Sequence, residues 1–147
     1  MKKVLAILLA LFLLIGSAVA DSLYILCQPD SFVNVRAFPR KGAEIAGRVE
    51  LGDELETDGV RRNGYIHVCG FEGGGWISTG FVTFTPVTVF KAETQINAKG
   101  RVACRRSING TRRKWLSDGQ KVVIFAFSDD WAITNQGFIK VRYLGVF

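Results

Sequence analysis

The segment Val33-Asn34-Val35-Arg36 returns later in the chain, in altered form, as Val102-Ala103-Cys104-Arg105. Both copies place apolar side chains at alternate positions, which is typical of a β-strand with one buried face. Other segments repeat in the same order, with gaps only at turn-rich positions. These pairs are 49–55 with 116–122, 65–68 with 131–134, and 75–82 with 137–144. A repeat of this length, somewhat over sixty residues, predicts one small unit built twice.

Short apolar or alternating runs, separated by glycine and charged turns, fill the chain after residue 20. No stretch carries apolar residues at i, i+3, i+4 and i+7 for three turns, as a surface helix would. The 16 glycines and 11 phenylalanines agree with turns and strands. The sequence therefore predicts an all-β fold. The expected strands span residues 23–27, 32–36, 44–49, 54–58, 65–70, 75–78, 87–90, 95–97, 101–105, 114–116, 120–127, 131–134, 137–140 and 143–146.

The N-terminus has the features of an export signal. Met1-Lys2-Lys3 is followed by an apolar run from Val4 to Ile15, and Ala18 and Ala20 provide the small residues of a signal-peptidase site. The apolar run is shorter than the roughly 20 residues that span a bilayer. We expect a signal peptide over residues 1–20, cleaved after Ala20, and a secreted or cell-envelope protein that is not integral to the membrane. An uncleaved anchor is the alternative.

The junction between the two repeats falls in Thr83-Phe84-Thr85-Pro86. Pro86 cannot donate a hydrogen bond to a sheet, so it marks a boundary and not a central strand. We expect one domain over residues 21–86 and a second over 87–147, called below the first and second halves. Units of this size bury only modest cores, so docking of the halves would stabilise both.

These motifs together resemble the bacterial SH3-like (SH3b) domain, over nearly all of residues 32–83 and again in the second half. The residues that carry the resemblance are 33–36 with Pro39, 45–49 with Gly52, 65–68, 75–77 with Phe81-Val82, and then Trp131, 137–139 and Tyr143-Leu144. In the second half the proline is missing, and residues 106–110 stand at that turn. The resemblance implies two small SH3-like barrels in tandem. It also implies a non-catalytic module of exported proteins that binds peptidoglycan or its peptide bridges.

The positive charge belongs to the second half. The whole chain has a formal net charge of +6. The first half carries 6 basic and 9 acidic side chains, a net of −3, and the second carries 11 and 4, a net of +7. Six basic residues and one tryptophan fall close together there, and we call them the basic cluster. They are Arg101, Arg105, Arg106, Arg112, Arg113, Lys114 and Trp115. We expect them to form a ridge on one side and to bind the ligand.

Several partners fit such a ridge, because arginine pairs with carboxylates and phosphates. The leading hypothesis is a cell-wall polymer or peptide, and export disfavours nucleic acid. One alternative is another exported or host protein, bound in the groove between the halves. Another is a solvated face that docks in part on the acidic first half. Those acidic residues are Glu50, Asp53, Glu54, Glu56 and Asp58. The run Asn109-Gly110-Thr111 matches a glycosylation acceptor, but it is a turn signal first.

One histidine and three cysteines leave little material for a zinc site or a catalytic triad. We therefore expect no enzyme activity, no cofactor and no metal. A thiol hydrolase using Cys69 and His67, two apart on one predicted strand, is the remaining catalytic alternative. Export would permit one disulfide, for which Cys27 and Cys69 are the first pair to test. Cys104 matches Val35 and is expected to be a buried apolar residue.

Aromatic residues could fill the interior or stack on a ligand. Small barrels need large side chains inside, so we expect Trp131, Tyr65, Phe138 and Phe81 in the core. Trp115 follows three basic residues, and for it both roles stay open.

Overall fold

The computed structural model describes residues 20–145, so the expected signal peptide, except for Ala20, lies outside the described residues. Within this range the chain forms β-strands and two 3-10 helices without an α-helix, which confirms the all-β prediction. The strands are β1 (Asp21–Ile25), β2 (Val33–Arg36), β3 (Ile45–Val49), β4 (Glu54–Thr57), β5 (Arg61–Arg62), β6 (Tyr65–His67), β7 (Trp76–Ser78), β8 (Val82–Thr83), β9 (Ala92–Gln95), β10 (Val102–Arg105), β11 (Arg112–Leu116), β12 (Lys121–Ser128), β13 (Trp131–Thr134) and β14 (Gly137–Lys140). The 3-10 helices are η1 (Thr79–Phe81) and η2 (Val141–Tyr143).

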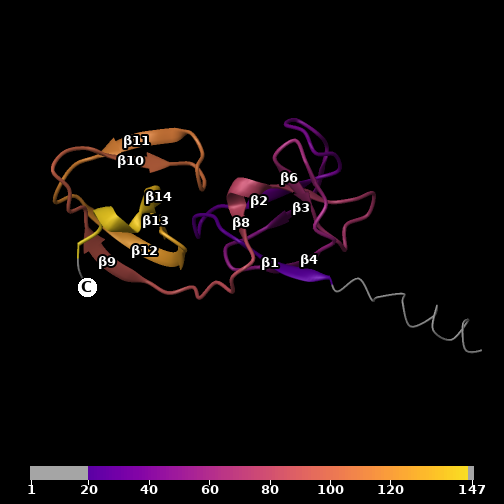
Figure 1. The fold of residues 1–147 in the computed structure, drawn as a ribbon, viewed down its shortest axis with the longest axis horizontal. Helices are drawn as coiled ribbons and strands as arrows, with labels where there is room; N and C mark the ends of the chain where they lie inside the picture. The colour runs from indigo at the N-terminus through magenta and orange to yellow at the C-terminus, as the bar shows by residue number, and fades with distance from the viewer. Residues whose placement is uncertain (1–19, 146–147) are drawn as a thin grey trace, which may run out of the picture.

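The strands form three antiparallel sheets. The first half contains a sheet ordered β4-β1-β8 and another ordered β3-β2-β7-β6-β5, whereas the second half forms a single sheet ordered β11-β10-β14-β13-β12-β9. In Figure 1 the second half lies on the left and the first on the right, and the chain from residue 84 to 91 joins them along the lower side. The described sheets are compatible with small barrel-like units, although none of them closes on itself.

The sequence repeat is also a repeat of strand pairing. β2 lies between β3 and β7, and β10 lies between β11 and β14. In both halves the register of the central strand shifts just before its terminal arginine. Each arginine then donates to a turn carbonyl at 2.8 Å, from Arg36 Nη1 to Ala43 O and from Arg105 Nη1 to Gly110 O. The two halves therefore share both their strand pairing and this side-chain hydrogen bond.

Two predicted strands are wrong. Residues 87–90 form no strand, and the first strand of the second half is β9. Val87 and Phe90 instead pack against buried clusters, so their apolar character serves packing and not strand pairing. Residues 143–146 are also not a strand in the described part, because η2 ends at Tyr143 and Leu144 makes a single bridge to Ile96.

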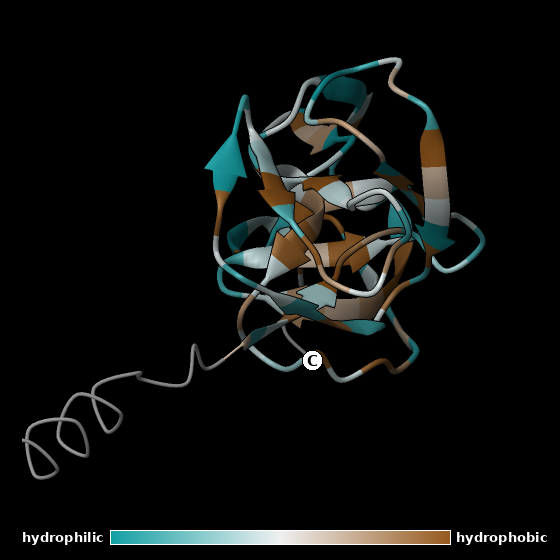
Figure 2. Cartoon of the chain, turned by 90° about the vertical axis from the view of Figure 1, so that its right-hand side faces the viewer, coloured by the Kyte–Doolittle hydropathy of each residue, from teal (hydrophilic) through white to brown (hydrophobic). Residues whose placement is uncertain are grey.

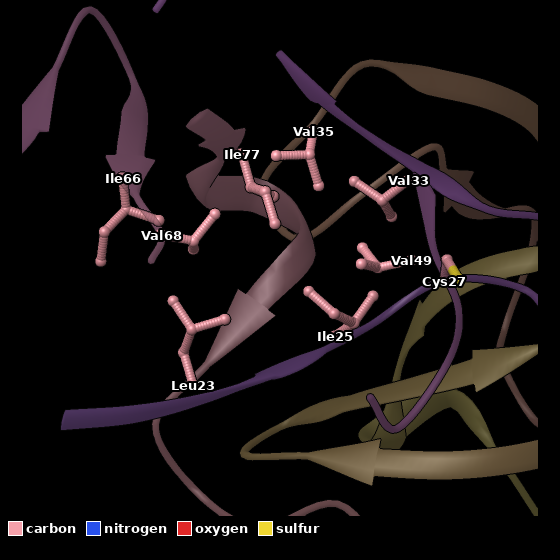
Figure 3. Close-up of a cluster of buried hydrophobic side chains, with 9 residues drawn as sticks. All are labelled: Leu23, Ile25, Cys27, Val33, Val35, Val49, Ile66, Val68 and Ile77. Atoms are coloured by element: carbon pink, nitrogen blue, oxygen red, sulfur yellow. The ribbon is translucent and has the colours of Figure 1, made fainter. Parts of the chain in front are cut away.

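Each half has its own apolar core. In the first half, side chains from β1, β2, β3, β6, β7 and neighbouring segments turn toward one another (Figure 3). This cluster comprises Leu23, Ile25, Cys27, Val33, Val35, Val49, Ile66, Val68 and Ile77. The second core comprises Ile96, Val102, Cys104, Leu116, Val122, Ile124, Ala132, Ile139 and Leu144. Hydrophobic segments accordingly gather inside, while many outer loops and strand ends are hydrophilic (Figure 2).

A third cluster joins the halves. Leu26 packs with Ala126, Trp131, Ile133 and Phe138, and partly buried residues of both halves cover it. Because these side chains come from both sides of the junction, the halves share apolar surface removed from water.

Hydrogen bonds reinforce this contact. Gln28 Nε2 donates to Thr134 O and Asn135 O at 3.1 and 2.8 Å, and its Oε1 accepts from Arg113 at 2.6 Å. The amide of Ile108 donates to Gly80 O. A single first-half glutamine is therefore held by three groups of the second half.

The expected core aromatics divide into two pairs. Trp131 and Phe138 are buried, as predicted. Tyr65 and Phe81 are only half-buried and line a surface pocket. Trp115 is 45% exposed, so it belongs to the surface.

All three cysteines are free thiols, so Cys27 and Cys69 are not bridged. Cys104 is fully buried in the second core, as its match to Val35 predicts.

Candidate functional site

A basic, aromatic pocket of about 340 Å³ lies on the second half. We call it the second-half pocket. Its lining carries four cationic and three aromatic side chains and no carboxylate. The lining residues are Arg101, Val102, Ala103, Arg105, Asn109, Trp115, Trp131, Lys140, Arg142 and Tyr143.

Strand register and one 3-10 helix assemble this pocket. Ala103 lies directly opposite Trp115 across β10 and β11, so the small residue leaves room beside the indole ring. Trp131 pairs with Lys140 across β13 and β14. The helix η2 then adds the final wall with Tyr143.

Cations stack on the aromatic rings of this pocket. The guanidinium carbons of Arg112 and Arg101 lie 4.6 and 5.5 Å from the centre of the Trp115 ring. Lys140 Nζ lies 4.1 Å from the centre of the Trp131 ring. A guanidinium that stacks by its face keeps its N–H edge for hydrogen bonds, so the arrangement is suited to a carboxylate or phosphate.

Two further contacts fix the cations at the rim. Arg142 Nη2 donates to Tyr143 Oη at 2.9 Å. Lys140 pairs with exposed Asp130, and its hydrogen bond lowers the pKa of that carboxyl below the ordinary 3.8. Asp130 therefore occupies Lys140, and the charge of Arg142 also acts on it, whereas no ion pair within residues 20–145 engages Arg101.

The basic cluster does not form the single ridge that the sequence predicts. Cys104 pairs with Lys114 and Arg105 pairs with Arg112, so Arg113 is the extra residue of a β-bulge. A bulge re-aims the side chains around it. Arg101, Arg105 and Trp115 line the second-half pocket, with Arg112 stacked on Trp115.

The remaining members of the cluster lie elsewhere. Arg106 and Arg113 line a groove between the halves, together with Arg105, and Lys114 bonds to the side chain of Gln136. The groove measures about 440 Å³. Its other lining residues are Cys27, Gln28, Ser31, Phe32, Phe81 and Phe138.

The alternative in which the cluster docks in part on first-half acids finds no ion pair in the described part of the chain. The contacts between basic and acidic side chains there are the ion pair of Lys140 with Asp130 and a hydrogen bond between His67 and Asp58. Arg113 binds neutral Gln28 instead. The contact between the halves is therefore apolar and hydrogen-bonded more than ionic.

A third pocket, of about 310 Å³, lies on the first half. We call it the first-half pocket. Sequence reasoning missed this pocket, and it also missed Lys140 and Arg142 in the second half. The available signal was the repeat itself, since a site in one copy predicts a matching site in the other. The lining residues of the first-half pocket are Phe32, Val33, Asn34, Arg36, Tyr65, Ser78 and Phe81.

The side-chain contacts of His67 are with Asp58 and Trp76. Its Nδ1 lies 2.8 Å from Asp58 Oδ2, and its ring centre is 5.0 Å from that of Trp76. Within residues 20–145 no hydrogen bond joins it to the Cys69 thiol, and β6 ends at His67, so the two are not on one strand.

Asp58 should make stability sensitive to acid. The Val60 amide, and then His67, lower the pKa of this carboxyl below 3.8. Because its folded pKa lies below the unfolded value, its stabilising contribution is complete above about 3.8 and is lost as the pH falls through the folded pKa. We expect the difference in unfolding free energy between the parent and Asp58→Asn to narrow as urea titrations move from pH 5 to pH 2. A constant difference would contradict this assignment.

The buried thiols are poorly suited to nucleophilic chemistry. Burial, with the charges of Asp53 and Glu50, raises the pKa of Cys27 to about 11. Burial likewise raises the pKa of Cys104, whose thiol donates to Gln136 O. A thiol with a raised pKa holds little thiolate at neutral pH.

Neither metal-binding clusters nor membrane-spanning helices are found among residues 20–145. No three His, Cys, Asp or Glu side chains gather there in a way that could hold a metal ion. No helix in this range has the length and apolar character needed to cross a membrane.

Comparisons with known proteins give only remote structural similarity. No family model and no curated protein matches the chain. Among solved structures, NlpC1 from Trichomonas vaginalis matches with a TM-score of 0.37 and 17% identity, over 90% of this chain and 48% of that one. NlpC2 from the same organism matches with a TM-score of 0.38 and 14% identity, over 90% and 50%. The chain spans about half the length of these two structures.

Proposed function

We propose that the protein is an exported binding protein, built as two SH3-like units in tandem, that holds an anionic component of the cell envelope in the second-half pocket. The observation that carries the proposal is the lining of that pocket, where four cations surround three aromatic rings without a carboxylate. Arginine and lysine attract carboxylates and phosphates, and the exposed ring of Trp115 offers apolar area to the rest of the ligand. The ligand class is a wall polymer with phosphate groups or a stem peptide with free carboxylates.

Binding, and not catalysis, is the proposed mode of action. Within the described residues His67 bonds to Asp58 and not to the Cys69 thiol, and burial raises the pKa values of Cys27 and Cys104. The second-half pocket itself contains no cysteine or histidine. Its side chains supply charge and stacking surface.

The test is sedimentation of the protein with purified cell walls across a salt series. We expect binding that weakens with salt, because exposed charges are screened within about 10 Å at 0.1 M. Replacing both Arg101 and Arg142 with alanine should weaken binding about tenfold and flatten the salt dependence, since each removes a charge-assisted hydrogen bond. These two residues are preferable to Arg105 and Arg113, which also hold Gly110 and Gln28.

The matched control removes the same charge elsewhere. Arg61 and Arg62 are exposed on β5 and line none of the three pockets. Replacing both with alanine should leave wall binding within about twofold of the parent. A second preparation of walls, stripped of anionic polymers by acid extraction, distinguishes the two ligand classes. Binding that persists on these walls is due to stem-peptide carboxylates, and binding that is lost is due to the polymer phosphates. Absence of wall binding at every ionic strength would remove the proposal.

The groove between the halves supports a second candidate, the binding of another exported or host protein. Phe32 is 48% exposed beside Arg105, Arg106 and Arg113 in the groove lining, which offers apolar and cationic area together. Two results together would favour the groove as the binding site. The parent and the Arg101 and Arg142 double variant would bind a partner protein with equal affinity, and neither would bind cell walls.

A further inference from the structure

The second-half pocket and the groove between the halves meet at Arg105, which lines both. β10 runs toward the first half and ends at this residue (Figure 1). The turn that follows lies against the first half, because the amide of Ile108 donates to Gly80 O. The two cavities are therefore neighbours on one surface, and Arg105 stands in the wall between them.

Every charged side chain in the two linings is cationic. We call these residues the basic track, and they are Arg101, Arg105, Arg106, Arg113, Lys140 and Arg142. Asp130 pairs with Lys140, and the charge of Arg142 also acts on it, so this carboxylate offsets one end of the track. No ion pair within residues 20–145 engages the other cations. The positive field of the track is therefore uncompensated over most of its length.

The cations of the track are spread out along the chain. Arg101 precedes β10 and Arg105 ends it, which separates their backbones by roughly 13 Å of extended strand. Arg101 stacks on the Trp115 ring, and a hydrogen bond to Gly110 O holds Arg105. Because both guanidinium groups are held in separate places, a single anion, whose hydrogen bonds reach about 3 Å, cannot use both. A ligand with one charge would engage part of the track, whereas a chain of charges could engage all of it.

The arginines of the groove keep hydrogen-bond donors for a ligand. Arg105 uses Nη1 for Gly110 O, and Arg113 uses Nη1 for Gln28 Oε1 at 2.6 Å. A guanidinium carries several N–H groups in a planar fork, so each of these side chains retains others. Arg106 is exposed in the same lining. Because Gln28 belongs to the first half, the contact between the halves orients a donor of the groove.

We infer that the basic track binds a polyanionic chain in which phosphodiesters alternate with short uncharged polyol units, across the second-half pocket and the groove at once. This ligand class rests on the proposed function and narrows it. One phosphate lies at Arg101 and Arg142, another at Arg105, and a further one at Arg106 and Arg113. Arginine pairs with phosphate oxygens through two parallel hydrogen bonds, so each position has a suitable donor.

Uncharged lining residues separate the cations and contact the polyol units. They are Ala103 and Asn109 in the pocket and Ser31 and Phe32 in the groove. A wall peptide with one or two carboxylates would leave most of the track unpaired, whereas a repeating phosphate fills it. Joining the contacts in one molecule also raises affinity, because the second contact forms within a complex that already exists.

A polyol phosphate fits the track better than a single-stranded nucleic acid. Nucleic acids without sequence preference bind through open aromatic faces on which successive bases stack. Trp131 is 4% exposed and lies against Lys140, and two arginines lie against Trp115. In the groove, Arg48 stacks on Phe32. The track thus offers charge at many positions and open rings at few, which favours a chain without bases.

The test is isothermal titration calorimetry of the protein with inorganic triphosphate and with poly(glycerol phosphate), in a salt series. Triphosphate is too short to reach from the pocket into the groove, so we expect the polymer to bind about tenfold or more tightly per phosphate. Single-stranded oligothymidylate with the same number of phosphates forms a parallel arm. We expect it to bind more weakly than poly(glycerol phosphate).

Arg106→Ala separates the two parts of the track. It should weaken the polymer about five- to tenfold, as for the loss of one charge-assisted hydrogen bond, and reduce the slope of log affinity against log salt by about 0.7–1. Triphosphate, held in the pocket, should keep its affinity within about twofold. Arg106→Lys preserves the charge and should restore the salt slope. Arg62→Ala, on β5 outside the three cavities, is the matched control and should change the binding of neither ligand.

Several results would each overturn the inference. They are equal affinity per phosphate for triphosphate and polymer, an unchanged polymer affinity in Arg106→Ala, tighter binding of oligothymidylate, and full wall binding after acid extraction. The Arg101 and Arg142 double variant keeps such a failure distinct from failure of the proposed function. If that variant loses wall binding while Arg106→Ala does not, the pocket alone is the anion site and the proposed function stands. Absence of wall binding by the parent would remove both.

Discussion

Phe138→Ala should lower the free energy of unfolding by about 3–5 kcal/mol, the usual cost of removing a buried phenylalanine ring. Phe138 is 1% exposed and lies in the cluster that joins the halves. Its ring meets Phe81 of the first half edge to face, with centres 6.4 Å apart. The substitution would leave a cavity beside Leu26 and Phe81 at the contact between the halves, and a packed interior closes such a cavity only in part. Urea titration followed by tryptophan fluorescence measures the change.

The control for this prediction is Phe38→Ala. Phe38 is 58% exposed, so the same ring is removed from the surface and stability should change by less than about 0.5 kcal/mol. Because Phe138 couples the halves, we also expect the single unfolding transition to broaden or to separate into two. An unchanged midpoint in Phe138→Ala would mean that the inter-half cluster contributes little to stability.

Gly137→Ala should destabilise the protein by about 3 kcal/mol or more, from backbone strain and overpacking together. Gly137 has a φ of +134°, which a residue with a Cβ atom rarely adopts. A Cβ there would also lie 2.6 Å from both Arg105 O and Cys104 Sγ. The clash involves backbone at the contact between β10 and β14, so the sheet itself would have to move. The midpoint of thermal unfolding reports the loss.

Gly100→Ala separates the two causes. Gly100 has nearly the same φ, +136°, but a Cβ there would meet nothing within 4 Å. It should therefore show the backbone strain alone, about 1–3 kcal/mol. If the two variants were equally stable, the close approach of β10 to Gly137 would not contribute to the loss of stability in Gly137→Ala.

The sequence predicts the strands best where burial alternates cleanly. β2 and β10 alternate between buried and half-buried positions, and both were found from their apolar pattern and their repetition. Residues 87–90 are similarly apolar, but Val87 and Phe90 pack on existing clusters without forming a strand. Local sequence does not distinguish an apolar residue that pairs in a sheet from one that only covers a core.

The site was only partly predictable for a comparable reason. Arg101, Arg105 and Trp115 belong to the second-half pocket, as the charge pattern suggests. The bulge at Arg113 then sends part of the cluster into the groove, and a register shift of this kind depends on the partner strand. Lys140 and Arg142 come from β14 and η2, and only the folded sheet brings them beside Arg101.

The position of β11 gives its charges a second consequence, for solubility. β11 is the outermost strand of the six-stranded sheet, so one of its sides presents unpaired backbone groups to solvent. Such an edge can recruit a strand from another molecule and begin aggregation, and consecutive lysines and arginines oppose this by repulsion. Arg112, Arg113 and Lys114 are all exposed on this strand. Two copies approaching edge to edge would bring six like charges together, so the charges of this strand oppose edge-to-edge association of the chain.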